Sequence, residues 1–135
     1  MNIEGNSVVV KKSQKEMFEF LTDLKNFEQL MPESIQKFEV DGDSFIFGLK
    51  GMPEIRLVLK DTTEYSNITL GAASSKLDFE LVADIDEVDA ETCEVKLDFN
   101  GKFNMMMAMM VKKPLTNFIE TLSDNLEKFK QKKFL

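Results

Sequence analysis

Residues 78–103, DFELVADIDEVDAETCEVKLDFNGKF, decide the fold. Apolar residues occupy every second position in two runs, from Phe79 to Ile85 and from Cys93 to Phe103, and most of the positions between them are charged or polar. A period of two is typical of a strand with one buried face. The connection at residues 89–91 is too short for a parallel crossover, so the two strands are predicted to form an antiparallel hairpin.

The same period continues toward the N-terminus as far as residue 34. It covers the runs 45–49, 55–59 and 68–74, with polar or glycine-containing turns near residues 41–43, 50–53 and 64–67. Short polar connections again indicate antiparallel neighbours. The sequence therefore predicts six antiparallel strands in a meander, all with one apolar face.

The two ends of the chain have different patterns. Residues 3–12 favour a first strand, and Ser13 followed by Glu16 is a capping-box signal that predicts the start of a helix. Apolar spacing predicts two short helices in series, ending before Pro32. Near the C-terminus the period becomes 3.6, with one apolar stripe formed by Leu115, Phe118, Ile119, Leu122, Leu126 and Phe129. Either this helix begins at Pro114 or a longer helix from about Asn104 is kinked there; the kinked long helix is favoured.

The stretch 17–33, MFEFLTDLKNFEQLMPE, resembles the signature of the START-like, or SRPBCC, superfamily, which includes polyketide cyclases and proteins like the birch-pollen allergen. In that family an aromatic and a hydrophobic residue precede an Asp, another aromatic follows, and a Pro ends the helical pair. The order of elements agrees along all 135 residues. Phe18 stands where many relatives have Trp, so the subfamily is not assigned.

The resemblance implies an α+β helix-grip fold in a single domain, residues 1–135, with the curved sheet wrapped around the long C-terminal helix. Packing arguments point the same way, because a strongly curved sheet around one helix is expected to leave a gap between them. Family members bind sterols, phospholipids, polyketides, quinones or other hydrophobic molecules in such a cavity, and a few are cyclases or aromatases. The resemblance carries over no catalytic residues.

Composition removes several function classes. The chain has no His, which excludes His-dependent triads and His-ligated metal sites, and its one cysteine, Cys93, can form no internal disulfide. A net charge of −7 with a single arginine, Arg56, disfavours nucleic-acid binding. Without a signal-like or membrane-spanning segment, the chain is expected in the cytoplasm, with no integral membrane association, no metal and no cofactor.

Candidate cavity-lining residues follow from their position on the apolar faces and in the methionine-rich run 105–110. Side-chain parity selects Phe45, Phe47, Leu57, Leu59, Leu70, Ala72, Ser74, Phe79, Leu81, Leu97, Phe99 and Phe103, to which the run adds Met105, Met106, Met109 and Met110. Flexible thioether side chains can repack around apolar guests of different shapes. Ser74, Ser75 and Asn104 are the candidate polar anchors, because apolar pockets usually contain a few polar groups.

Three functions remain open at this point. The first is a binding or carrier protein for a small hydrophobic molecule such as a lipid, a quinone or a polyketide. The second is a cyclase or aromatase in which an inward carboxylate or Tyr65 moves protons. Most carboxylates occupy strand positions that alternate with the apolar residues and so face outward, which disfavours this function. The third is a protein-interaction domain with a filled core. Such a domain would bind its partner through the methionine run or the C-terminal lysines, and the same residues could make a transient contact with a membrane surface.

Overall fold

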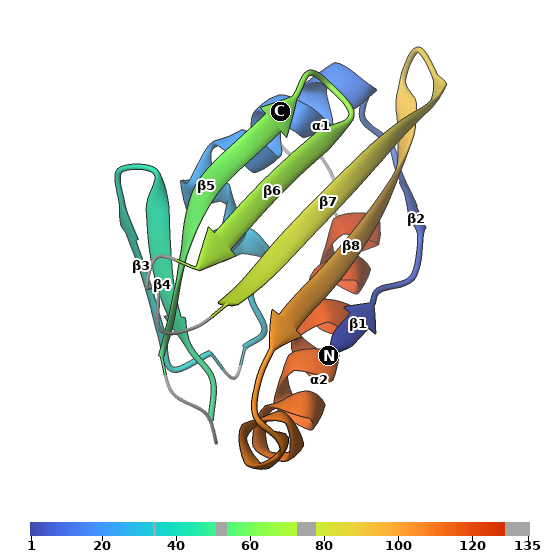
Figure 1. Ribbon diagram of the computed structural model, residues 1–135. Helices are drawn as coiled ribbons and strands as arrows, with labels where there is room; N and C mark the ends of the chain where they lie inside the picture. Colours follow the sequence, from blue (N-terminus) through green and yellow to red (C-terminus); the bar gives the residue numbers. More distant parts are fainter. Residues whose placement is uncertain (34, 51–53, 73–77, 129–135) are drawn as a thin grey trace.

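A curved antiparallel sheet of eight strands packs against one long helix in the computed structural model (Figure 1). The structure describes residues 1–33, 35–50, 54–72 and 78–128. Its elements are β1 (Asn2–Glu4), β2 (Val8–Val10), α1 (Gln14–Thr22), the 3-10 helix η1 (Leu24–Leu30), β3 (Lys37–Asp41), β4 (Ser44–Gly48), β5 (Ile55–Thr63), β6 (Asn67–Ala72), β7 (Asp78–Asp89), β8 (Thr92–Lys102) and α2 (Met105–Lys128). This is the helix-grip architecture that the sequence predicts.

The predicted N-terminal strand is two short strands, β1 and β2, which both pair with β8. The break lies around Gly5, whose N–H donates to the carbonyl of Leu97 at 2.7 Å. A Cβ at Gly5 would lie 2.7 Å from that oxygen and 2.9 Å from Ile119 Cγ2 and from Ser123 Oγ. Helix α2 thus crosses so close to the chain here that only glycine fits.

The capping box at Ser13 is confirmed. Ser13 Oγ accepts from the N–H of Glu16 at 3.1 Å, and the N–H of Ser13 donates to Glu16 Oε1 at 3.0 Å. The second predicted helix is η1, which follows α1 directly and buries Phe27 against the ring of Phe45 at a centroid separation of 5.2 Å. These two helices cover one end of the sheet and lead the chain into β3.

The six predicted strands are β3 to β8, each paired with the next along the chain. Register shifts between Leu59 and Asp61 on β5 and between Glu87 and Asp89 on β7 interrupt the ladders. Such irregularities bend and twist strands, which helps the sheet to curve. Arg56, on the outer face of β5, donates to Ser44 Oγ at 2.9 Å.

Helix α2 contains Pro114 in its interior, so the long helix rather than the short one is confirmed. It runs behind β8 and β1 in Figure 1 and packs against β1, β2, β8 and η1. Its buried side chains are Val111, Leu115, Phe118, Ile119, Leu122, Ser123 and Leu126. The predicted stripe is therefore the buried face, apart from Phe129, which lies outside the described residues.

Candidate functional site

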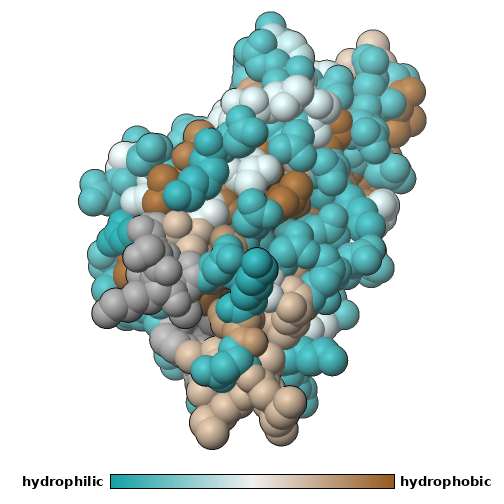
Figure 2. Space-filling view, viewed as in Figure 1, coloured by the Kyte–Doolittle hydropathy of each residue, from teal (hydrophilic) through white to brown (hydrophobic). Residues whose placement is uncertain are grey.

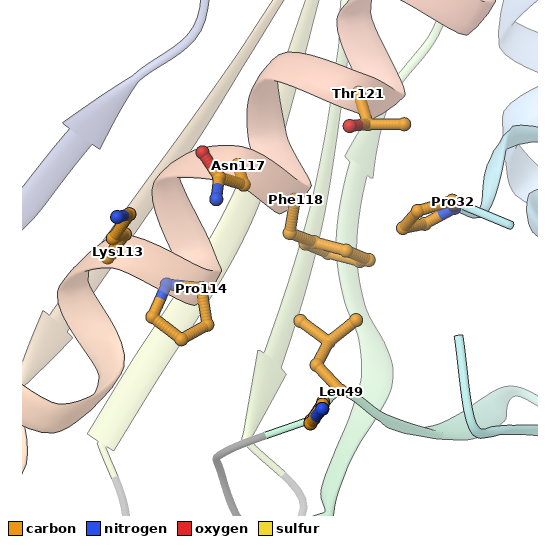
Figure 3. A pocket seen from close by; sticks show the side chains of 8 residues that line it. Pro32, Leu49, Lys113, Pro114, Asn117, Phe118 and Thr121 are labelled. Atoms are coloured by element: carbon orange, nitrogen blue, oxygen red, sulfur yellow. The ribbon is translucent and has the colours of Figure 1, made fainter. Parts of the chain in front are cut away.

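A pocket of about 280 Å³ opens between the middle of α2, the end of η1 and the end of β4 (Figure 3). Its lining residues are Pro32, Leu49, Lys50, Lys113, Pro114, Asn117, Phe118 and Thr121. In Figure 3 the ring of Phe118 lies between Pro32 and Pro114, and Leu49 lies next to its face. The pocket thus has an apolar floor formed by three separate segments of the chain.

Two contacts of α2, one at the pocket and one further along the helix, fix its position. The ring of Phe118 stacks on that of Phe47 in β4, with centroids 4.6 Å apart and an interplanar angle of 4°. About two turns further along the helix, Asn125 Nδ2 donates to the carbonyl of Leu30 at 2.8 Å, which ties α2 to η1. A stacked aromatic pair and a half-buried hydrogen bond hold the helix firmly against the sheet.

The Phe47–Phe118 stack corrects one expectation. The sheet and α2 were expected to remain separated by a gap, but at this point they are in direct contact. The physical reason is side-chain size, since one phenyl ring from each element spans the distance that the backbone curvature leaves. The pocket therefore lies beside the contact, toward the surface, where α2 presents Pro114 and the polar Asn117.

The rim of the pocket is polar and positively charged. Lys50 and Lys113 supply two ammonium groups, and Asn117 and Thr121 supply an amide and a hydroxyl. Among the lining residues that the structure describes there is no carboxylate, and no ion pair within the described part of the chain involves either lysine. In a protein of net charge −7, the described rim of this pocket is therefore a locally positive part of the surface.

Most of the sheet residues proposed as cavity lining lie in the packed core. Phe45, Phe47, Leu57, Leu70, Phe79, Leu81, Leu97 and Phe99 are buried, and Leu59, Ala72 and Phe103 are partly buried against that core. The stacked pairs Phe79–Phe99 and Phe79–Phe103 show that several of these side chains fill space with one another. None of them lines the pocket described above. A role for them as ligand contacts stays a prediction.

The remaining candidates occupy other positions. Met105, Met106, Met109 and Met110 are exposed on the outer face of α2. Asn104, proposed as a polar anchor, accepts a hydrogen bond from the N–H of Met107 at 2.8 Å and so caps the helix. Ser74 and Ser75 lie outside the described residues.

Cys93, Asp98 and Tyr65 are three ionisable residues whose surroundings bear on proton transfer. Burial raises the pKa of the Cys93 thiol to about 11, with Glu16 adding to the effect, so this thiol stays protonated and unreactive at neutral pH. Burial also raises the pKa of Asp98, on the outer face of β8. Tyr65 packs edge-on against Phe18 of α1, at 5.4 Å between ring centroids. None of these residues lines the pocket.

The salt bridge between Glu4 and Lys96, at 2.8 Å, joins β1 to β8 on the solvated face. The Lys96 ammonium lowers the pKa of the Glu4 carboxyl, and Glu4 in turn raises the pKa of Lys96. Both shifts arise from an exposed structural pair and do not indicate a catalytic site.

Within residues 1–33, 35–50, 54–72 and 78–128 no three His, Cys, Asp or Glu side chains cluster as a metal site would require. In the same residues, no helix is both long and apolar enough to cross a membrane.

The pocket residues were not found from the sequence. Leu49 lies on the apolar face of a predicted strand, and Phe118 lies on the buried stripe of α2, so both patterns indicated core. Pro32 and Pro114 were recognised as helix signals only. Lys113, Asn117 and Thr121 lie on the outer side of the helix, which periodicity assigns to solvent. Only the approach of η1 and β4 makes that side of the helix the wall of a pocket.

No protein-family model matches the chain, and no curated protein matches it in sequence. Solved structures do match in fold. Norcoclaurine synthase from Thalictrum flavum, in complex with dopamine and hydroxybenzaldehyde, has a TM-score of 0.66 at 12% identity, covering 98% of this chain and 89% of that one. A conserved protein from Geobacillus kaustophilus has a TM-score of 0.67 at 13% identity, covering 95% and 93%.

A protein from Thermus thermophilus is similar to the same degree, with a TM-score of 0.68 at 12% identity and 95% of each chain covered. At these identities the likeness shows the fold alone. It supports the helix-grip architecture over nearly the whole chain.

Proposed function

We propose that this chain binds a small molecule with an apolar body and an anionic group in the pocket beside α2. The observation that carries the proposal is the composition of the pocket: a floor of Phe118, Leu49 and two prolines, with Lys50 and Lys113 at the rim. Apolar walls with a few placed polar groups are typical of ligand sites. The apolar floor favours burial of a hydrocarbon or ring system, and the ammonium groups favour an acid group at the mouth.

The size of the pocket limits the ligand. A cavity of roughly 150 Å³ holds a benzene molecule, so a volume of about 280 Å³ suits two rings or a short chain. Of the ligand classes expected from the sequence, a lipid-like or polyketide-like acid uses both the floor and the lysines. A quinone is neutral and leaves the lysines unused. The acid is therefore the preferred ligand class.

The fold comparison supports a binding role without naming the ligand. Norcoclaurine synthase, with the same fold, has been solved with dopamine and hydroxybenzaldehyde bound. An enzymatic role of the cyclase type required an inward carboxylate or Tyr65. The lining residues described here include neither, so binding is the proposal that their chemistry favours.

Anilinonaphthalene sulfonate tests the proposal, because it combines fused apolar rings with one negative charge. Binding to the folded protein is followed by fluorescence titration. Lys113→Glu is expected to weaken binding by about tenfold or more, since a charge-assisted contact is replaced by a repulsive one. Asn117→Trp, at an exposed position on the rim, is expected to abolish binding by occupying the pocket.

The matched control is Lys112→Glu. It makes the same charge change one residue away, on an exposed lysine that does not line the pocket. A second control replaces the probe by neutral phenylnaphthylamine, whose binding should not depend on Lys113. Equal losses of sulfonate binding in Lys112→Glu and Lys113→Glu would contradict the proposal, because they would indicate a general charge effect.

A further inference from the structure

Four methionines form an exposed apolar surface at the start of α2. The exposed fractions are 81% for Met105, 78% for Met106, 77% for Met109 and 49% for Met110. Spacings of three and four place them side by side along one face of the helix. We call these four residues the methionine face. Figure 2 shows its pale brown surface at the lower end of the molecule, where Figure 1 places the start of α2.

The opposite face of the same turns is also apolar. Val111 is buried, and Met107 packs against the core. A helix that is apolar all round is normally covered on every side. A contiguous apolar surface on the order of a few hundred Å² is often a binding surface in a soluble protein. The methionine face is therefore a candidate binding surface, and the surrounding charge indicates which kind of partner fits it.

Charge is distributed unevenly along the molecule. Residues 99–119, which contain the methionine face, include Lys102, Lys112 and Lys113 and no acidic residue, in a chain with 24 acids and 17 bases. One carboxylate approaches from β7, since Asp78 lies 3.8 Å from Lys102, and both side chains are largely exposed. At the far tip of the β7–β8 hairpin, residues 84–94 contain six acids and no base. Figure 1 shows this tip and the start of α2 at opposite ends of the molecule.

We infer that the methionine face docks on the surface of an anionic lipid membrane. Apolar side chains flanked by lysines are the pattern of an interfacial helix, which inserts its apolar face among the lipids and places its basic residues at the headgroups. The acidic hairpin tip is repelled by the same surface. The charge distribution therefore turns the methionine face toward the membrane.

A second copy of the chain is a less suitable partner for the methionine face than an anionic membrane. A symmetric dimer brings the same patch of each copy together. It would place Lys102, Lys112 and Lys113 of one copy against those of the other, with no acidic residue in either segment 99–119 to compensate. The inference goes beyond the proposed pocket, because docking needs no ligand in it.

Vesicle flotation tests the inference with the full chain. We expect the protein to float with vesicles that contain phosphatidylserine mixed into phosphatidylcholine and to remain unbound with phosphatidylcholine alone. Binding should weaken as salt is added, because salt screens the attraction. The double variant Met106→Glu with Met109→Glu is expected to lose binding by at least about tenfold. Lys112→Glu alone should lose about fivefold, the effect of one basic residue at such a surface.

Two controls match these changes at the other end of the molecule. Val88→Glu alters a residue that is 55% exposed near the acidic hairpin tip, and Lys15→Glu reverses an exposed charge on α1. Both should bind like the unmodified protein. All variants should show unchanged circular dichroism melting, since the altered side chains are exposed.

Three results would overturn the inference. One is equal binding to vesicles with and without phosphatidylserine. Another is equal loss of binding in the control variants. The third is light scattering that shows a dimer broken by Met106→Glu with Met109→Glu, together with no vesicle binding, which would assign the methionine face to a second copy. Loss of sulfonate-probe binding in Asn117→Trp without loss of flotation would separate the pocket from the docking surface, because this change blocks the pocket and removes no lysine.

Discussion

The two halves of α2 are parts of one continuous helix with opposite relations to the rest of the protein. The half after Pro114 buries Leu115, Phe118, Ile119, Leu122 and Leu126 against the sheet. The half before it exposes four of its first six side chains to solvent. Both halves are rich in apolar residues, so hydrophobicity alone does not decide burial. Position relative to the sheet decides it.

The difference between the halves has a geometric origin. The C-terminal half is opposite β8, β1 and β2 and is tied to η1 by the Asn125–Leu30 hydrogen bond. The N-terminal half follows directly from the end of β8, where α2 begins after Asn104. The sheet can cover one side of this segment, at Val111, but its outer side remains uncovered. The pocket lies at the junction, around Pro114.

The largest expected effect is that of Phe118→Ala. Removing the ring that stacks on Phe47 should lower the free energy of unfolding by about 3–5 kcal/mol, the usual cost of deleting a buried phenyl group. Urea unfolding measures it. Met109→Ala, in the other half of the same helix, should change that free energy by less than about 0.5 kcal/mol. Similar losses of unfolding free energy in the two variants would contradict the contrast between the buried and the exposed half of α2.

A smaller change is expected for Pro114→Ala, at the junction of the two halves. Proline supplies no N–H to the carbonyl of Met110, and an interior helical proline is costly. Restoring the hydrogen bond should raise the free energy of unfolding by about 1–2 kcal/mol, even though alanine gives the unfolded chain more freedom. The same urea series measures it. A loss of stability would instead mean that the Pro114 ring contributes packing at the pocket that outweighs the missing bond.

The smallest effect on stability is expected from oxidation of the exposed methionines. Dilute hydrogen peroxide should convert Met105, Met106, Met109 and Met110 to sulfoxides well before the buried Met17 and Met31, because oxidation follows solvent access. Peptide mass spectrometry at successive times gives the order. The melting temperature should stay almost constant while the exposed group reacts. Early oxidation of Met17 would show that the burial contrast is wrong.

Much of the fold could be predicted from residue patterns. The alternation in residues 78–103 gave the β7–β8 hairpin, and the pair Ser13 and Glu16 gave the start of α1. These predictions succeed because strand parity and helix capping depend on neighbours within a few residues. The division of the first strand into β1 and β2 was not predicted. It depends on the approach of Ile119 and Ser123 to Gly5, more than a hundred residues away.

The pocket and the methionine run could not be predicted from residue patterns. Parity correctly placed Phe47 and Phe99 on the inner face, yet it could not show that Phe47 meets Phe118 and closes the space between sheet and helix there. The run 105–110 was open to two interpretations, as a cavity wall or as an exposed contact surface. The structure places four of its five methionines at the surface, while Met107 packs against the core.

The amino-acid sequence alone determined which segments are strands and helices, which side of each strand is apolar, and that no histidine-based chemistry is available, because these depend on residue type and short-range spacing. Only the tertiary structure decided which apolar residues touch each other and which remain uncovered. Those outcomes depend on distances between segments far apart in the chain, such as Leu49 and Phe118 at the pocket, and spacing along the sequence carries no information about such distances.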